Sequence, residues 1–358
     1  MSGLYETVFG APPGAVGRAP ARANLLGEHT DYNDGFVLPT PLAFHTTVEA
    51  GMGDDAADAD AAMVTAHAAQ FGATVTRRLD RPRQGDWMDY VVGCLSVLAE
   101  RGSAIPPLRL AVASDVPMGA GVSSSAALEV AVLRAVRDLL DLDLDDRTLA
   151  QLGRRAENRY VGMQCGIMDQ MVAALGVFGK ALLLDTSDLT TRLIDLPDRH
   201  RIAIVHCGVA HKLTEGGYNT RRGECNAAAD RLGVASLRDV GLDDLDRIAA
   251  LAPPLDRRAR HVVTENRRVL DGVAALERGD IGAFGVLMNA SHDSQRDDYD
   301  VSIPEIDALV DSARRHGAVG ARLTGGGFGG SIVALVEETA YDAWLRAVLA
   351  DRPQAQPI

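Results

Sequence analysis

The feature that most constrains the fold is a run of strand, glycine-rich turn and helix across residues 108–140. Residues 108–116 are mostly apolar, which is typical of a buried strand, and Pro117 ends the run. Residues 122–140 are apolar on nearly every side of a helix up to Leu133, which predicts a buried helix. The turn therefore has to bring the unpaired N–H groups of a helix N-terminus next to the end of a core strand.

That turn, residues 117–127, has the composition of a phosphate-binding loop. It holds glycines, which let a backbone approach a ligand closely, and serines, whose hydroxyls can donate hydrogen bonds. The helix N-terminus adds N–H donors and the positive end of the helix dipole. A plain serine N-cap after a tight turn would need fewer of these residues. The segment favours anion binding, with simple capping as the alternative.

Lysine is nearly absent, which restricts the kind of phosphate site. Lys180 and Lys212 are the only lysines in the chain. A P-loop requires Gly-Lys followed by Ser or Thr, and Gly179-Lys180 is followed by Ala181, so a P-loop fold is excluded. A phosphate site here must rely on arginine, metal ions and backbone N–H groups.

A second glycine-rich stretch has the spacing of a dinucleotide-binding fingerprint at Gly325, Gly327 and Gly330. The residues that follow, 331–336, predict a strand instead of the helix that the fingerprint requires. We therefore reject a dinucleotide site. We expect this stretch to pack closely against another backbone and to support the phosphate loop.

Length and charge limit the architecture and the partners. The chain of 358 residues exceeds the roughly 250–300 at which one core stops growing, so we expect two lobes around a cleft. The formal charge of −13 would repel polyanions, so we expect no nucleic-acid partner and no membrane partner. The arginine pairs Arg77-Arg78 and Arg221-Arg222 are expected on solvated helix faces or strand ends.

The N-terminal residues and the cysteines predict a cytoplasmic protein. Residues 1–17 lack a basic start followed by an apolar stretch, and no apolar segment reaches the roughly 18 residues of a membrane helix. The cysteines are far apart and form no Cys-x-x-Cys pair, so we expect reduced, mostly buried thiols and neither zinc nor disulfides at Cys94, Cys165, Cys207 and Cys225.

Hydrophobic periodicity places strands and helices in mixed order, which favours an α+β fold over a doubly wound sheet. We expect an exposed acidic loop at residues 51–62 that holds Asp54, Asp55, Asp58 and Asp60, and a frayed tail at residues 351–358. Besides the elements named above, strands are expected at residues 36–50, 181–184 and 202–206, and helices at residues 87–98, 148–160, 221–232, 259–275 and 303–316.

A polar cluster lies near the N-terminus, within residues 20–35. Glu28, His29 and Asp31 occupy three of four consecutive positions there. Carboxylates accept two or more hydrogen bonds and imidazole adds a directional partner, so the cluster suits the paired hydroxyls of a sugar. A polar loop has many other uses, so these residues alone do not identify the ligand.

Three motifs together resemble a known family. Residues 20–35, which include Gly-Glu-His-Thr-Asp-Tyr at 27–32, closely resemble the galactokinase signature. Residues 117–127 resemble the second motif of the GHMP small-molecule kinases, and residues 323–330 resemble their third. The motifs occur in the family's order, and the stretches at 87–90, 165–170, 218–225 and 291–304 are similar too.

The resemblance implies a fold and a reaction. We expect an N-terminal ribosomal-S5-like lobe over residues 1–178 and a C-terminal ferredoxin-like lobe over residues 179–358, with the active site in the cleft. The enzyme would be a monomer that transfers the γ-phosphoryl group of ATP to the anomeric C1 hydroxyl of galactose, with Mg²⁺ as cofactor.

The resemblance also implies roles for particular residues. Arg22 and Asp169 would be catalytic, with Asp169 either a general base or a group that orients the hydroxyl. Ser125 and Glu157 would hold Mg²⁺. The sugar would contact Glu28, His29, Asp31, Gly166, Asp169 and Tyr218. The nucleotide would contact Gly119, Ala120, Gly121, Val122, Ser123, Ser124 and Ser125, with Trp87 and Tyr90 near the adenine.

Structural readings compete with several of these roles. Trp87 and Tyr90 also fit the apolar face of a core helix. Glu157 could form a surface ion pair with neighbouring arginines. Tyr218 could be an exposed tyrosine in a glycine-rich loop.

Two other functions stay open: a sister kinase for N-acetylgalactosamine or arabinose, and a catalytically silent galactose sensor. The chain departs from the family's usual residues at Ala21, Gln295, Ile303 and Ser331, and we expect only Ala21 to lie near the chemistry. Alanine there requires a backbone that avoids positive φ.

Overall fold

The computed structural model describes residues 3–53, 63–209 and 215–358. The chain forms two compact units, and each is assembled from separated segments. Unit 1 comprises Met1–Ala21, Leu42–Val116 and Ser123–Leu175, and unit 2 comprises Arg22–Pro41, Pro117–Val122 and Gly176–Ile358. The last division between the units lies between Leu175 and Gly176, and the lobes expected over residues 1–178 and 179–358 stay a prediction. The acidic residues Asp54, Asp55, Asp58 and Asp60 lie outside the described residues.

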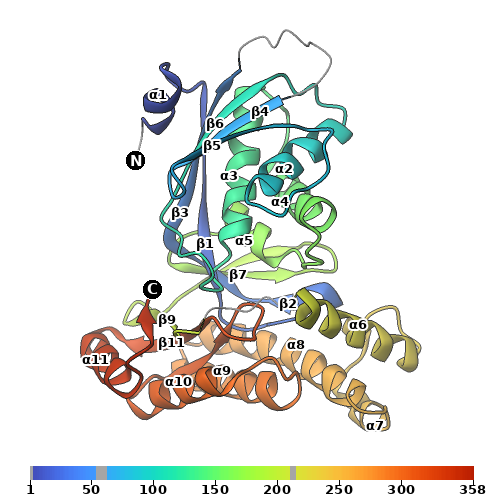
Figure 1. Ribbon diagram of the computed structural model, residues 1–358. Coiled ribbons are helices and arrows are strands. Elements are labelled where there is room, and N and C mark those ends of the chain that lie inside the picture. Colours follow the sequence, from blue (N-terminus) through green and yellow to red (C-terminus); the bar gives the residue numbers. More distant parts are fainter. Residues whose placement is uncertain (1–2, 54–62, 210–214) are drawn as a thin grey trace. The chain divides into compact units, whose positions relative to one another are not determined.

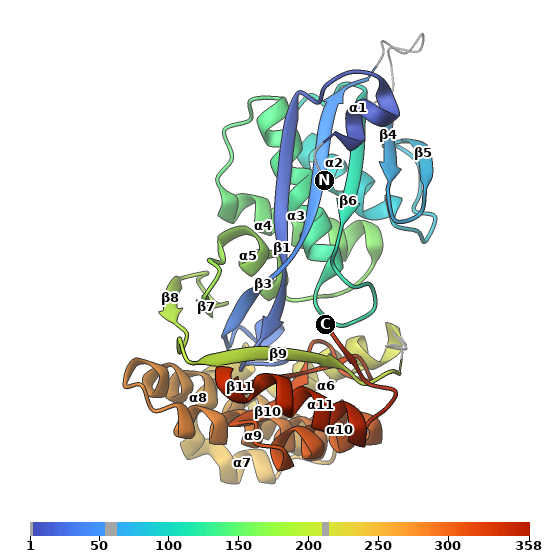
Figure 2. The ribbon, with the colours of Figure 1, turned by 90° about the vertical axis from the view of Figure 1, so that its left-hand side faces the viewer.

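Unit 1 is a sheet with most of its helices on one face (Figures 1 and 2). The strand order is β1 (Ala15–Asn24), β3 (Pro39–Met52), β6 (Leu108–Ser114), β4 (Met63–Ala68), β5 (Ala73–Arg78). Strand β6 runs antiparallel to β3 and parallel to β4. Helix α1 (Leu4–Phe9) lies across the other face from α2 (Met88–Glu100), α3 (Ser124–Leu139), α4 (Asp146–Ala156) and α5 (Met168–Leu175). A π-helical turn, Glu157–Val161, extends α4.

Close packing in unit 1 depends on a glycine in β1. A Cβ added to Gly17 would come within 2.0 Å of the carbonyl oxygen of Ala131 on α3. Any side chain would separate the strand from the helix, so the small residue allows the two backbones to touch. Helix α3 is buried on most of its surface, as its apolar sequence predicts, and its N-terminus is held at the glycine-rich turn.

Unit 2 contains an antiparallel sheet in the order β10 (Gly320–Thr324), β11 (Ser331–Glu337), β9 (His200–His206), β12 (Gln356–Pro357). A smaller sheet has the order β2 (Phe36–Val37), β7 (Lys180–Asp185), β8 (Thr191–Asp195). The helices of this unit are α6 (Glu215–Leu232), α7 (Leu245–Ala249), α8 (Leu255–Glu277), α9 (Ile281–Asp297), α10 (Pro304–Arg315) and α11 (Tyr341–Asp351). Helices α9 and α10 pack on β10, and α6 packs on α8.

The α+β class is confirmed. The strands and helices expected from periodicity are present close to their expected ends, except that α6 begins at Glu215 instead of residue 221 and the strand expected over residues 36–50 is divided into β2 and β3. The expectation of a frayed tail at residues 351–358 is wrong. Gln356 and Pro357 pair with β9, the N–H of Ile358 donates to the carbonyl of Ile204 at 2.9 Å, and Ala355 is buried. Backbone pairing to an open sheet edge orders the chain end, a long-range contact that tail composition does not reveal.

The expectation that the arginine pairs are solvated is wrong for one member of each pair. Arg77 is buried at the end of β5, where it donates to Asp89 at 2.8 Å and also pairs with Asp86. Arg221 is buried in α6 and donates to the backbone carbonyl of Tyr299 at 2.7 Å. Buried guanidinium groups need such partners because an unpaired buried charge is costly.

No disulfide links the four cysteines, and Cys94, Cys207 and Cys225 are buried, as the sequence predicts. Within residues 3–53, 63–209 and 215–358, none of the helices has both the length and the apolar character needed to cross a bilayer.

Candidate active site

The phosphate loop is held in unit 2 by Arg22 and by the second glycine-rich stretch. Arg22, near the end of β1, is buried; its N–H donates to the carbonyl of Val122 at 3.1 Å and its guanidinium donates to the carbonyl of Gly121 at 2.7 Å. Ala21 is part of β1 and does not adopt positive φ, as its alanine requires. The arginine therefore fixes the loop through two bonds.

The glycine-rich stretch after β10 packs against the same loop. A Cβ on Gly325 would lie 2.8 Å from the carbonyl oxygen of Gly121, and the Ser331 hydroxyl donates to the carbonyl of Ala120 at 2.6 Å. Gly325 has φ of +91°, a left-handed conformation that glycine adopts without strain. The close packing expected for this stretch is confirmed, and Ser331 lies next to the same loop.

Left-handed backbone shapes the loop itself. Gly119, Gly121 and Ser123 have φ of +72°, +76° and +62°. A Cβ on Gly119 would meet nothing within 4 Å, so the backbone there faces open space. Ser123 makes no side-chain cap of α3; its hydroxyl instead donates to Asp169. The alternative reading of this serine as a plain helix cap is therefore wrong.

Glu28 is buried and already has protein partners. Its carboxylate accepts hydrogen bonds from Arg322 at 2.8 Å, from the Asn24 amide at 2.6 Å and from the Gly325 N–H at 2.5 Å. Burial raises the pKa of Glu28 above its ordinary value, and the guanidiniums of Arg322 and Arg22 act in the opposite direction. Glu28 thus connects the loop of residues 27–32, here called the signature loop, to β10 and to the glycine-rich stretch.

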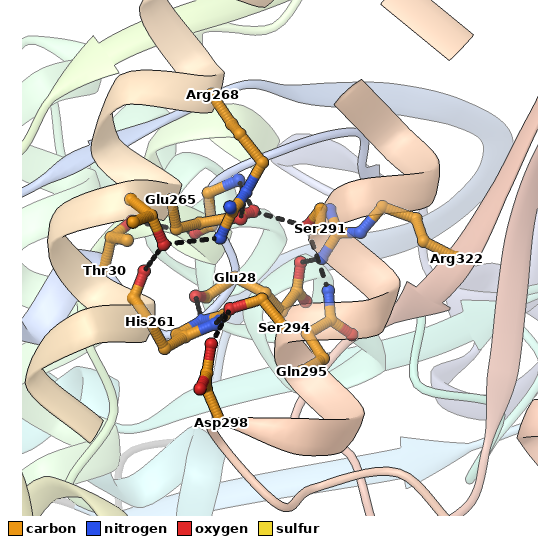
Figure 3. A network of polar contacts seen from close by, with 12 residues as sticks. Glu28, Thr30, His261, Glu265, Arg268, Ser291, Ser294, Gln295, Asp298 and Arg322 are labelled. Carbon is orange, nitrogen blue, oxygen red and sulfur yellow. Dashed lines mark hydrogen bonds and ion pairs between the residues drawn. The ribbon is translucent and has the colours of Figure 1, made fainter. Parts of the chain in front are cut away.

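A buried polar network extends this connection into two helices (Figure 3). Glu265 on α8 accepts from the Gly27 N–H at 2.8 Å, from Ser291 at 2.6 Å and from Arg268 at 2.6 Å. Burial alone would raise the pKa of Glu265, but Arg268 and Arg322 hold it well below its usual range. The Glu28 carbonyl also faces Nε2 of His261 at 3.1 Å.

Gln295 belongs to the same network. With its amide oxygen turned toward Arg322, it accepts from the Arg322 Nε at 2.9 Å. The expectation that Ala21 alone among the four unusual residues lies near the chemistry is therefore wrong for Gln295 and Ser331, which contact the partners of Glu28 and the phosphate loop. The chain folds these distant positions together through α9 and β11.

His29 lies among three tyrosines in unit 2. Its ring centroid lies 4.8 Å from that of Tyr299, 5.4 Å from that of Tyr218 and 5.8 Å from that of Tyr32. Its Nδ1 lies 2.9 Å from the Tyr32 hydroxyl, whereas its buried Nε2 has no hydrogen-bond partner among the residues that the structure describes. Burial, followed by the charges of His261 and Arg221, lowers the pKa of His29 well below its usual range.

Two further residues expected to contact the sugar, Tyr218 and Asp31, also lie in unit 2. Tyr218 is in the first turns of α6, so the expectation of an exposed tyrosine in a loop is wrong. Its ring packs against Tyr32 with centroids 5.3 Å apart. Asp31 begins the short 3₁₀ turn Asp31–Asn33, two residues after His29, whose φ of +63° turns the chain there.

Unit 1 gathers a group of buried carboxylates. Glu157 and Glu129 both accept from the Gln170 amide, at 2.8 and 2.9 Å. Burial, followed by the charge of Asp169, raises the pKa of Glu157 to about 7, while a hydrogen bond from Ser125 acts to lower it. Asp169 is at the start of α5, one residue before Gln170. Gly166 is buried in the loop before this helix.

The surface-pair reading of Glu157 is wrong. Its side chain is buried, and the neighbouring Arg155 and Arg159 pair with Glu100 instead, at 2.6 and 2.8 Å. Within the described parts of the chain, no group of three His, Cys, Asp or Glu side chains could hold a metal ion by itself. A cation at Ser125 and Glu157 would need further oxygen ligands from its substrate or from water.

The two aromatic residues expected near the adenine, Trp87 and Tyr90, lie in different surroundings. Trp87 precedes α2 and stacks on the half-exposed Phe71, with ring centroids 6.2 Å apart and 29° between the planes. Tyr90 is on α2, where burial and the charges of Glu157 and Glu129 raise the pKa of its hydroxyl well above the usual value. Trp87 is thus partly exposed beside Phe71, whereas Tyr90 belongs with the carboxylate group.

Sequence reasoning missed Glu265, Arg322, His261 and Tyr299, which hold the signature loop. Each lies more than 200 residues away from it in the chain. The signal available was a charged residue at a position of helical or strand periodicity that should be apolar, as for Glu265 on α8 and Arg322 on β10.

Comparison with known proteins gives the same grouping of motifs. Residues 3–52 match the galactokinase galactose-binding signature, residues 89–177 match the GHMP kinases N terminal domain, and residues 273–351 match the GHMP kinases C terminal domain. A galactokinase from Roseiflexus sp. is 44% identical over 349 residues, which are 95% of this chain and 88% of that protein. A galactokinase from Actinobacillus succinogenes is 42% identical, with 97% and 91% covered.

A solved structure agrees over nearly the whole chain. The Lactococcus lactis galactokinase, whose crystal structure contains galactose, superposes with a TM-score of 0.92 at 32% identity and covers 99% of this chain and 95% of its own. Identity at this level across almost the full length of each relative extends well beyond the three motifs. The chain belongs to the galactokinase family, the ATP-dependent sugar kinases within the GHMP kinases.

Proposed function

We propose that this chain transfers the γ-phosphoryl group of ATP to the anomeric C1 hydroxyl of galactose, giving galactose 1-phosphate and ADP. The observation that carries the proposal is the buried Nε2 of His29, which lies within the galactose-binding signature and has no partner among the described residues. A buried imidazole nitrogen normally has a hydrogen-bond partner, and a sugar hydroxyl can act as one.

The sugar would be bound by carboxylate, imidazole, phenol and backbone groups. The contacting residues would be Glu28, His29, Asp31, Gly166, Asp169 and Tyr218. A carboxylate offers about four acceptor sites, so Glu28 can accept a sugar hydroxyl in addition to its three protein donors. Tyr218 and His29 would present ring surface and a polar edge to the same ligand.

The nucleotide phosphates would lie on residues 119–125. The open backbone at Gly119 and the left-handed φ of Gly119, Gly121 and Ser123 allow close approach of an anion to this loop. The contacting residues would be Gly119, Ala120, Gly121, Val122, Ser123, Ser124 and Ser125. The stack of Trp87 on the half-exposed Phe71 supports a place for the adenine at Trp87.

Ser125 and Glu157 would hold Mg²⁺. The fit rests on charge: Glu157 and Glu129 are buried and both accept from the Gln170 amide, and burial together with the charge of Asp169 raises the pKa of Glu157, so a cation there would stabilise its carboxylate. Hydroxyl and carboxylate oxygens are the ligands that this hard cation prefers. When bound, the ion would neutralise charge that develops on the phosphoryl oxygens.

Asp169 would accept or orient the proton of the C1 hydroxyl. Its carboxylate already accepts a hydrogen bond from Ser123, which would fix its direction next to the phosphate loop. Arg22 would add positive charge for the transferring phosphoryl group, and its bond to Gly121 keeps it at the loop.

For Asp169→Ala we expect turnover to fall about 10²–10⁴-fold, the usual contribution of a positioned proton acceptor. ATP affinity should change less than about twofold, because Asp169 is not one of the phosphate-loop donors. ADP release and calorimetric ATP titration measure the two quantities. Asp188→Ala removes an exposed carboxylate in a turn and should behave as the unchanged chain. A near-normal kcat in Asp169→Ala would refute the role.

The identity of the preferred substrate is tested by measuring ADP release with ATP, Mg²⁺ and each of galactose, N-acetylgalactosamine, arabinose and mevalonate. The highest kcat/KM should be for galactose. A preference for N-acetylgalactosamine or arabinose would identify a sister sugar kinase, and release with none of them would favour a galactose sensor. We also expect a cytoplasmic monomer, which fractionation and analytical ultracentrifugation would check.

A further inference from the structure

Four side chains of unit 2 form a line of polar contacts behind His29. Its Nδ1 lies 2.9 Å from the Tyr32 hydroxyl, which lies 2.6 Å from the Tyr299 hydroxyl, which lies 3.1 Å from the Cys225 Sγ. All of His29, Tyr299 and Cys225 are buried. His29 is in the signature loop, Tyr299 follows α9, and Cys225 is on α6. The line ends at Nε2 of His29, which has no hydrogen-bond partner among the described residues.

The position of a single proton decides what this nitrogen can bind. Burial lowers the pKa of His29 well below its usual range, so the imidazole is neutral and carries its proton on one ring nitrogen. With the proton on Nε2, that atom is a hydrogen-bond donor; with the proton on Nδ1, it is an acceptor. The partner of Nδ1 sets which of the two forms is present.

The two tyrosines transmit this choice along the line. Burial raises the pKa of both Tyr32 and Tyr299 well above the usual value, so each keeps one hydroxyl proton. Each hydroxyl oxygen contacts two neighbours but has one proton to donate. The three hydrogen bonds therefore all run toward His29 or all run toward Cys225.

The chemistry of the two ends selects the direction. The imidazole nitrogen is a strong acceptor, whereas thiol sulfur is a weak one. Burial raises the pKa of Cys225 to about 11, so the thiol keeps a proton to donate. The sulfur also has a hydrogen bond with Asn33, and at the contact between Cys225 and Tyr299 either atom can be the donor. The bonds therefore run from Cys225 toward His29.

We propose that Cys225, Tyr299 and Tyr32 form a directional hydrogen-bond chain that keeps the His29 proton on Nε2, so that this nitrogen donates to an oxygen of the sugar. The last clause rests on the proposed function; the tautomer itself does not. The three residues are positioning residues, since they act on the sugar through His29.

The first test observes the tautomer directly, without ligand. Long-range ¹H–¹⁵N correlation spectra of the full chain with ¹⁵N-labelled histidine distinguish the two neutral forms, and His29→Gln assigns the signal. We expect a protonated Nε2 and an unprotonated Nδ1 at pH 7.5, and a mixture of tautomers in Tyr299→Phe. A proton on Nδ1 in the unchanged protein, or a Tyr299→Phe spectrum without any change, would overturn the proposal.

The second test separates positioning from general structural damage. Loss of one neutral hydrogen bond corresponds to about 3–10-fold in affinity, so Tyr299→Phe and Cys225→Ala should raise the KM for galactose by that factor. The KM for ATP and kcat should stay within about twofold. Cys225→Ser keeps a donor and should restore the galactose KM. Tyr341→Phe, which removes a tyrosine hydroxyl on α11, is the matched control.

The two proposals can fail independently. If the variants raise the KM for ATP as much as the KM for galactose and also lower kcat by a similar factor, the residues have a structural role and the hydrogen-bond chain is overturned. If the unchanged protein phosphorylates galactose while its His29 carries the proton on Nδ1, the inference fails and the proposed function stands. If it shows the Nε2–H form but phosphorylates no sugar, the proposed function fails and the tautomer assignment stands.

Discussion

At the scale of single residues, the loop that would meet the sugar is fixed by charges buried on its far side. Arg322 is fully buried and lies 2.8 Å from Glu28, and Glu265 lies 2.6 Å from Arg268. Breaking such a pair leaves an uncompensated buried charge, which destabilises a fold by about 3–5 kcal/mol. The orientation of the signature loop is therefore coupled to the stability of the whole unit.

His261 makes this part of the fold sensitive to acid. Burial lowers its pKa from 6.5 to about 4. The unfolded chain takes up a proton below pH 6.5 that the folded chain does not bind until about pH 4, so the free energy of unfolding falls as the pH falls through this window. The stability that His261 contributes as a neutral side chain is fully present above pH 6.5. His261→Gln should flatten the dependence, measured by urea unfolding at pH 5.0 and 7.5.

The control for this prediction is His67→Gln on β4 in unit 1. It should leave the difference in unfolding free energy between the two pH values unchanged. An equally steep loss of stability at pH 5.0 in His261→Gln and in the unchanged protein would contradict the assignment of the acid sensitivity to His261.

At the scale of elements, the glycine-rich stretch and the phosphate loop act as one packed layer in unit 2. Gly325→Ala would place a Cβ 2.8 Å from the Gly121 carbonyl and would strain a residue with φ of +91°. We expect the KM for ATP to rise at least about tenfold, with a smaller effect on the KM for galactose, in initial-rate kinetics.

Gly279→Ala separates backbone strain from the clash. Gly279 follows α8, has φ of +70° and would meet nothing within 4 Å on gaining a Cβ. That variant carries the cost of positive φ, about 1 kcal/mol of stability, without contact to the phosphate loop. A KM for ATP that rises equally in both variants would show that the contact with Gly121 is not responsible.

At the scale of the whole molecule, unit 2 cannot be cut out as one continuous piece. It includes Arg22–Pro41 and Pro117–Val122 as well as Gly176–Ile358. A fragment of residues 176–358 would leave Arg322 without Glu28 and Glu265 without the Gly27 N–H. We expect it to lack cooperative thermal unfolding by circular dichroism, and co-expression with residues 1–175 to restore folding and ADP release. A fragment that unfolds cooperatively by itself would show the boundary to be a true domain limit.

Local chemistry determined much of this protein from the sequence. The strand, turn and helix of residues 108–140 are set by apolar periodicity and by glycine, and they appear as β6, the phosphate loop and α3. Strand β1 was not apparent, because its alternating Ala, Gly, Pro and Arg residues have low strand propensity and its place depends on β3 and α3.

The partners of the site residues were decided only by the tertiary structure. The sequence by itself determined which residues are polar in the signature loop, which glycines can turn left-handed and which elements are buried. It could not determine that Glu28 pairs with Arg322 or that Tyr299 lies behind His29. Periodicity tells which face of an element is buried, whereas the choice of partner across hundreds of residues follows from how the buried faces pack.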